Sequence, residues 1–131
     1  MSRRMAREEL FKILFEIEMA GETPENILKK KEKEYSKADN EFIEKYAIEI
    51  VENKTELEEV INGNMKNWKL NRLGTVERTL LKIATYEILK TEVGTEIIIN
   101  EAVELAKIYG DEKSYEFING VLAVIVSKIR K

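Results

Sequence analysis

Apolar residues recur with the period of an α-helix along most of the chain, and this pattern limits the possible folds more than any other feature. The segment from Phe42 to Val51 shows it most clearly, because its apolar residues follow the i, i+3, i+4, i+7, i+8 spacing of one helix face. Only one Pro and six Gly are present to interrupt such helices. We therefore expect an all-α protein.

Capping signals divide this pattern into seven predicted helices, two of them short. A side chain that accepts a backbone N–H, or a glycine, indicates a helix start, and glycine or asparagine indicates an end. The predicted starts are Ser2, Thr23 with Pro24, Asp39, the capping box of Thr55 and Glu58, Gly74 with Thr75, Gly94 with Thr95, and Asp111. The predicted ends include Gly21, Asn62–Asn64 and Gly110, and a connector containing Trp68 precedes the fifth helix. Seven such helices fit one domain that spans residues 1–131.

The chain contains no histidine and no cysteine, which excludes most kinds of active site. Serine–histidine and cysteine–histidine catalysis cannot be built, and the usual ligands of structural zinc are absent. Neither a P-loop nor a glycine-rich dinucleotide motif is present, so nucleotide phosphates have no recognisable binding site. We expect a protein that is not an enzyme and has no catalytic residues and no cofactor.

Pairs of glutamates leave a carboxylate metal site as an alternative. Glu101 with Glu104, and Glu41 with Glu44, lie three residues apart on predicted helices and could face one Mg²⁺ ion. In a chain with 25 acidic residues, such spacing arises by chance. We expect solvated helix surface at these positions and no metal.

The sequence carries no signal for export or for membrane insertion. The lack of cysteine means that the chain needs no oxidising compartment. Its N-terminus has no apolar signal core, and no stretch approaches the roughly 18 apolar residues that a membrane span requires. We expect a cytoplasmic protein with no membrane partner.

Positive charge is concentrated at the N-terminus of an otherwise acidic chain. The net charge is −3, but residues 1–7 hold three arginines and no acid, so they carry +3 and the other 124 residues carry −6. The spacing of Arg3, Arg4 and Arg7 places them on one side of the first predicted helix. Arginine suits phosphate geometry and stacks on bases. Any site for a polyanion is therefore expected to be local.

Three arginines alone predict weak RNA binding. They neutralise at most about three phosphates, for a salt slope of roughly −2 on a single strand, so tight binding needs stacking surfaces or a second protein. Phe15 lies eight residues after Arg7, on nearly the same side of the helix. It is either a core residue or an aromatic platform beside the arginines.

Polar and small residues interrupt the apolar pattern of the last two predicted helices. Asn119 and Gly120 lie inside the last helix, where glycine costs about 1 kcal/mol relative to alanine, so we expect close approach of another helix or of a ligand. Asn100 and Glu101 lie between apolar residues and form either a buried polar network, with a partner such as Arg78, or an exposed stripe. We favour the buried network.

Two segments and the opening of the chain resemble one known family. The sequences INEAVELAKIYGDEKSYEFINGVL at 99–122 and GTVERTLLKIATYEI at 74–88, with ARE at 6–8 after an arginine-bearing start, are similar to the NusB transcription antitermination factors. The resemblance covers essentially the whole chain. It implies an all-helical bundle of two helical subdomains around a long N-terminal helix.

The resemblance also implies function and partners. NusB proteins bind the single-stranded boxA element of ribosomal RNA leader transcripts, best together with NusE, a small-subunit ribosomal protein that doubles as a transcription factor. It further implies a place in the antitermination complex of RNA polymerase. Family members occur as monomers and as homodimers, so a homodimer is possible here.

Residue roles carried over from the family follow the matching positions. Phe15 takes a position that is often tyrosine, so only stacking or packing is implied there. The resemblance implies RNA contacts by Arg3, Arg4, Arg7, Phe15 and Phe117, a partner or RNA face at Glu77, and polar support of the fold by Asn100, Glu101 and Asn119.

The chain departs from the family pattern at two positions. Gly94 replaces a common proline, which loosens a loop, and Ala123 replaces a common acid, which removes a surface charge.

Two other functions are alternatives to this one. One alternative is a helical adaptor that binds only protein. The other is an accessory domain of an RNA-modifying enzyme, because NusB-like domains occur fused to ribosomal RNA methyltransferases.

Overall fold

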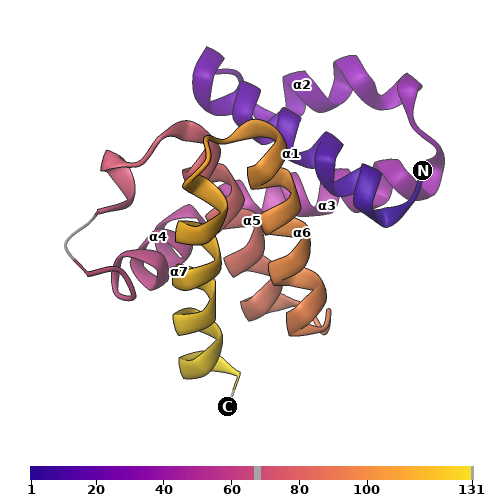
Figure 1. Cartoon of the computed structure of the whole chain (residues 1–131). Coiled ribbons are helices and arrows are strands. Elements are labelled where there is room, and N and C mark those ends of the chain that lie inside the picture. The colour runs from indigo at the N-terminus through magenta and orange to yellow at the C-terminus, as the bar shows by residue number, and fades with distance from the viewer. Residues whose placement is uncertain (67–68, 131) are drawn as a thin grey trace. The chain divides into compact units, whose positions relative to one another are not determined.

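In the computed structural model, which describes residues 1–66 and 69–130, the chain is all-α (Figure 1). These residues form seven α-helices and two short 3₁₀ helices, and none of them lies in a strand. The expected fold class and number of helices are confirmed for this part of the chain, whereas Trp68 lies outside it. The chain divides into two compact units, Met1–Asn53 and Lys54–Lys131. No helix in the described residues is both long and apolar enough to cross a membrane.

The first unit is built on its N-terminal helix. It contains α1 (Arg3–Ala20), α2 (Pro24–Lys31), η1 (Glu32–Glu34) and α3 (Lys37–Glu52), and α1 packs against both α2 and α3. One isoleucine from each α-helix, Ile13, Ile27 and Ile43, is buried at the centre of this unit. The apolar residues of α1 that recur with helical spacing therefore form its core face.

Local capping signals account for most helix boundaries in this unit. Ser2 accepts the N–H of Met5 at 3.1 Å, and Gly21 ends α1 in the left-handed conformation with φ 69°. Thr23 caps α2 with Pro24 at its first position. These predictions are confirmed.

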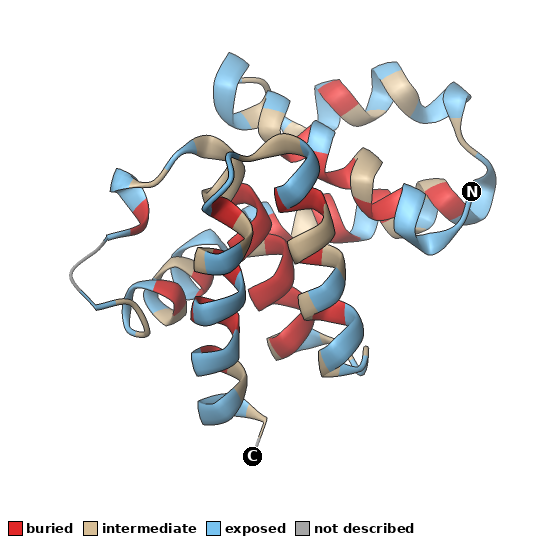
Figure 2. Cartoon of the chain, in the orientation of Figure 1, coloured by how far each residue is buried: buried red, intermediate tan, exposed pale blue. Residues whose placement is uncertain are grey.

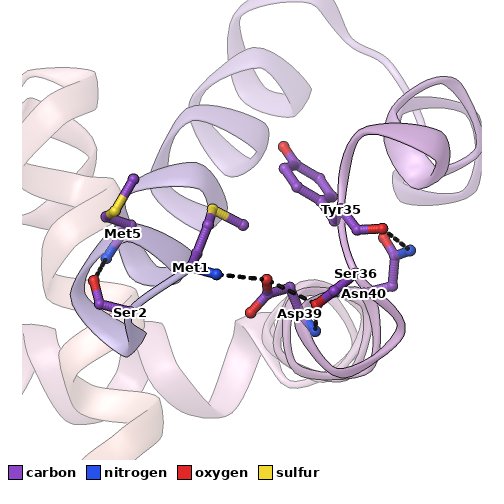
Figure 3. Close-up of polar contacts among 7 residues, drawn as sticks. All are labelled: Met1, Ser2, Met5, Tyr35, Ser36, Asp39 and Asn40. Carbon is purple, nitrogen blue, oxygen red and sulfur yellow. Dashed lines mark hydrogen bonds and ion pairs between the residues drawn. The ribbon is translucent and has the colours of Figure 1, made fainter.

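The predicted cap of the third helix is wrong. Ser36, not Asp39, is the N-cap of α3 and accepts the Asp39 N–H at 3.2 Å. Its hydroxyl donates in turn to Asp39 Oδ2 at 2.9 Å (Figure 3). Asp39 thus lies inside the first turn of α3, and its carboxylate accepts the Ser36 hydroxyl. Asp39 is not the cap because Ser36, three residues earlier, already accepts a free N–H of this turn.

The second unit is arranged around α5. It contains α4 (Lys54–Asn62), η2 (Leu70–Arg72), α5 (Thr75–Lys90), α6 (Thr95–Tyr109) and α7 (Ser114–Ile129), and α5 packs against α4, α6 and α7. Figure 2 shows buried residues along most of α5. The α5 helix, whose apolar residues lie on more than one side, is therefore central within the unit. Gly74 and Gly94 cap α5 and α6 as predicted.

Two helix starts in this unit differ from prediction. The α4 helix begins at Lys54, so Thr55 lies inside it and is not the N-cap. The α7 helix begins at Ser114 after a turn, with Lys113 as its N-cap. Asp111 still receives the N–H groups of Lys113 and Ser114 at 2.9 and 3.1 Å, but from three residues before the helix.

Gly110 ends α6 for a different reason from Gly21. Its φ of −96° is open to any residue. A Cβ at this position would lie 2.6 Å from Ser114 Cβ and 2.8 Å from the Ala106 carbonyl oxygen. Glycine is therefore required by the close return of the chain into α7, not by a left-handed cap.

The guanidinium of Arg130, just after α7, ties the end of α5 to the start of α6. Within the described residues it donates five hydrogen bonds of 2.6 to 3.2 Å, to the carbonyls of Glu87, Ile88, Thr91 and Val93 and to Thr95 Oγ1. The last carbonyls of a helix have no partner within it. Arg130 supplies that partner for α5 from more than 35 residues away.

We expect Arg130→Ala to lower the free energy of unfolding by about 2–3 kcal/mol, because several carbonyls lose a charged donor at once. Arg130→Lys should recover less than half of this loss, since an ammonium cannot reproduce the planar fork. Urea unfolding followed by circular dichroism measures both. The exposed Lys128→Ala serves as the control, and a loss below about 0.5 kcal/mol in Arg130→Ala would contradict the prediction.

Candidate nucleic-acid interface

The three N-terminal arginines occupy the first turns of α1 but are not equally accessible. Arg3 and Arg4 are exposed, whereas Arg7 is 6% exposed. The Arg3 guanidinium lies 4.1 Å from the ring centroid of Phe42 on α3, a cation–π contact within the first unit. Arg3 and Arg4 thus form the accessible part of the basic site, and Arg7 belongs to the buried face of α1.

Asp39 lies near the same end of α1. The Ser36 hydroxyl, the Met1 amino group 3.2 Å from its carboxylate and the charge of Arg3 together hold the pKa of Asp39 below its ordinary value of 3.8 (Figure 3). A carboxyl whose pKa is lowered by folding stabilises the fold above its ordinary pKa. That contribution is lost as the pH falls through the lowered pKa.

We expect the unfolding free energy to fall as the pH drops below about 4, and Asp39→Asn to show a smaller fall over this range. The variant should also be less stable than the parent at pH 6, where the carboxylate is charged. Urea titrations at pH 6, 4, 3 and 2 measure the difference. Identical pH profiles for the two proteins would refute the role given to Asp39.

Phe15 is half-buried on α1. Its ring centroid lies 5.9 Å from that of Phe11, which is buried in the core. One part of the ring therefore packs and another part reaches the surface. The structure accommodates both interpretations that the sequence allows for this residue.

Glu77 and Phe117 line one pocket of about 280 Å³ in the second unit, between the N-termini of α5 and α7. The Ser114 hydroxyl donates to Glu77 Oε1 at 2.7 Å and thereby joins the two helix starts. Arg72 and Lys113 also line the pocket, so an aromatic ring lies beside two cations. The exposed part of the ring can stack a base, while the carboxylates of Glu77 and Asp111 balance the two cations of the lining.

The pocket wall is held by a compact polar network around Asp111. The N–H of Lys113, the Ser114 hydroxyl and the N–H of Ser114 lower the pKa of the Asp111 carboxyl. Sequence reasoning missed Arg72 and Ser114. The short spacing of Asp111 and Ser114 before an apolar helix is a signal that could have indicated Ser114, but nothing local marks Arg72.

Asn100, Glu101 and Asn119 lie together on a larger open groove of the second unit. The asparagines are exposed and Glu101 is half-buried. The expected buried network is therefore wrong for Asn100, which belongs to the exposed stripe that the sequence also allowed. Support of the fold by these three residues stays a prediction.

Gly120 is also exposed, and apart from its chain neighbours and the adjacent backbone of its own helix, no described atom lies within 4 Å of a Cβ built there. Close approach of another helix is thus not the reason for this glycine in the described structure. Among the described residues, no three acidic side chains gather in a way that could hold a metal ion. Glu104 pairs with Lys107 at 3.5 Å.

Comparison with known proteins identifies the family. The NusB family model matches residues 4–127. The chain belongs to the NusB family. The transcription antitermination protein NusB of Bacillus cereus (strain B4264) is 40% identical over 126 residues, which cover 95% of this chain and 97% of that relative.

Solved NusB structures share the fold. The structure of T. maritima NusB matches with a TM-score of 0.91 and 37% identity, covering 98% of this chain and 92% of that chain. A structure described as antitermination factors NusB and NusE in complex with dsRNA matches with a TM-score of 0.84 and 30% identity, covering 98% and 99%.

Family membership confirms the resemblance carried by residues 74–88 and 99–122. It makes the chain a transcription antitermination factor and not an enzyme. The roles of its individual arginines, of Phe15, and of Glu77 and Phe117 stay predictions.

Proposed function

We propose that residues 1–131 act as a single NusB-type RNA-binding domain, which binds the boxA element of ribosomal RNA leader transcripts together with NusE. The observation that carries the proposal is the similarity of the whole chain to a protein solved with NusE and RNA. By this proposal the protein joins the antitermination complex of RNA polymerase and works on nascent transcripts in the cytoplasm.

We assign the RNA contacts according to accessibility. Arg3 and Arg4 hold phosphates, and Arg7, which is 6% exposed, contributes through a small accessible edge or by positioning the helix. Phe117 stacks a base in its pocket, Glu77 faces RNA or partner, and Phe15 adds a second apolar surface. Two accessible arginines neutralise about two phosphates, for a salt slope near −1.4, so binding without NusE is weak.

The experiment is fluorescence anisotropy with a boxA-like single-stranded RNA, a scrambled strand and a duplex, titrated with protein alone and with its cognate NusE. The duplex is needed because the related complex contains dsRNA. The proposal expects the boxA strand to bind best and NusE to strengthen its binding. If none of the three RNAs binds with or without NusE, the protein is an adaptor that binds only protein.

We expect the double variant Arg3→Ala, Arg4→Ala to weaken boxA binding on the order of tenfold and to flatten the salt slope by about 1.4. The matched control is Lys29→Ala, Lys33→Ala, which removes the same charge from exposed positions of the first unit. Equal losses in the two variants would mean that only net charge matters, and would refute an arginine site.

We expect Phe117→Leu to weaken boxA binding by about 1–3 kcal/mol, because leucine keeps apolar volume but cannot stack a base. Phe117→Tyr, which retains the ring, should bind like the parent. Anisotropy in the presence of saturating NusE measures both, with thermal unfolding as the check on folding. Leucine and tyrosine variants of equal affinity would exclude stacking at this position.

Sedimentation velocity of the free protein decides between monomer and homodimer. Met5 and Met19 of α1 are 53% and 63% exposed, which offers apolar surface for a second copy. We propose that binding of RNA and NusE dissociates any such dimer.

A further inference from the structure

The α6–α7 groove is the set of described residues that line the large open hollow between these two helices, with a volume of about 820 Å³. It lies entirely within the second unit and contains none of the residues to which RNA contacts are assigned. Its apolar surface comes from Ile97, Ile99 and Val103, and Ile97 is 52% exposed. A single exposed apolar residue is ordinary, but apolar residues that line one hollow together are a feature of binding surfaces.

Two asparagines flank this apolar surface, Asn100 from α6 and Asn119 from α7. Each carboxamide offers two donors and an acceptor. An extended peptide presents unpaired N–H and C=O groups along its length, whereas a helix has already paired its own. The lining of α6 from Thr95 to Lys107 rises about 18 Å, which matches five or six extended residues.

The charge of the groove selects the kind of partner. Glu96, Glu101 and Glu116 line it, and Lys107 is the only cation among its described lining residues, so three carboxylates stand against one amine. Lys107 already lies 3.5 Å from Glu104 and 5.2 Å from the Tyr115 ring centroid. A net charge of −2 disfavours a polyanion and favours a basic ligand.

We propose that the α6–α7 groove binds an extended, basic segment of another protein. Aliphatic side chains of that segment pack on Ile97, Ile99 and Val103, and its backbone pairs with Asn100 and Asn119. Its Lys or Arg side chains face the carboxylates of Glu96 and Glu116. This site is independent of the RNA site and would remain if the RNA proposal failed.

The probe is a capped nine-residue peptide of alternating valine and arginine, titrated into the full chain by isothermal calorimetry. The control peptide has glutamate in place of arginine. Ile97→Ser and the double variant Asn100→Ala, Asn119→Ala test the two kinds of contact. Ile108→Ser is the matched control, because Ile108 is 63% exposed on the same helix and does not line the groove.

We expect the arginine peptide to bind and the glutamate peptide not to bind. The affinity for the arginine peptide should fall about tenfold in Ile97→Ser and in the double asparagine variant, and should not change in Ile108→Ser. Because the substituted asparagines are exposed, unchanged thermal unfolding should accompany the loss; a drop in stability would assign them to the fold instead. No binding, equal binding of both peptides, or equal affinity of all variants overturns the proposal. Competition by RNA, or self-association that Ile97→Ser abolishes, overturns it as well.

Discussion

The hydrogen bonds of Arg130 hold together the part of the molecule on which both proposed sites in the second unit depend. The guanidinium reaches the last carbonyls of α5 and the loop before α6, while its backbone continues α7. A single side chain thereby connects the three helices that carry the pocket of Phe117 and the α6–α7 groove. Because the bonds run from a charged donor to several carbonyls at once, an apolar contact cannot replace them.

At the N-terminal ends of α5 and α7, opposite to Arg130, the side chain of Ser114 also joins two helices by hydrogen bonds. It joins Glu77 at the start of α5 to Asp111 before α7 and so fixes the wall from which Phe117 projects. The hydrogen bonds of Arg130 and Ser114 hold opposite ends of these helices. One face of each helix then packs in the core while another face stays accessible, and the two candidate sites lie on these accessible faces.

Sequence reasoning predicted helix starts correctly where no competing cap or extra turn lies nearby, as at Ser2, Thr23, Gly74 and Gly94. It failed at Asp39, because Ser36 offers a competing cap, and at Asp111, because a turn separates that residue from its helix. The exposure of Asn100 was not predictable, since the adjacent Ile97–Ile99 run does not reveal which face is buried. The burial of Arg7 and the reach of Arg130 depend on tertiary packing, which no local pattern reports.

The contact between Arg3 and Phe42 has a thermodynamic consequence for recognition. A freely moving arginine loses about 2 kcal/mol of rotamer entropy when a ligand fixes it. Arg3 gives up part of that freedom on folding, when it settles on the aromatic ring. An anion that binds Arg3 therefore removes less side-chain entropy than it would from a freely moving arginine. The net affinity of the site for an anion is accordingly higher than its small number of arginines suggests.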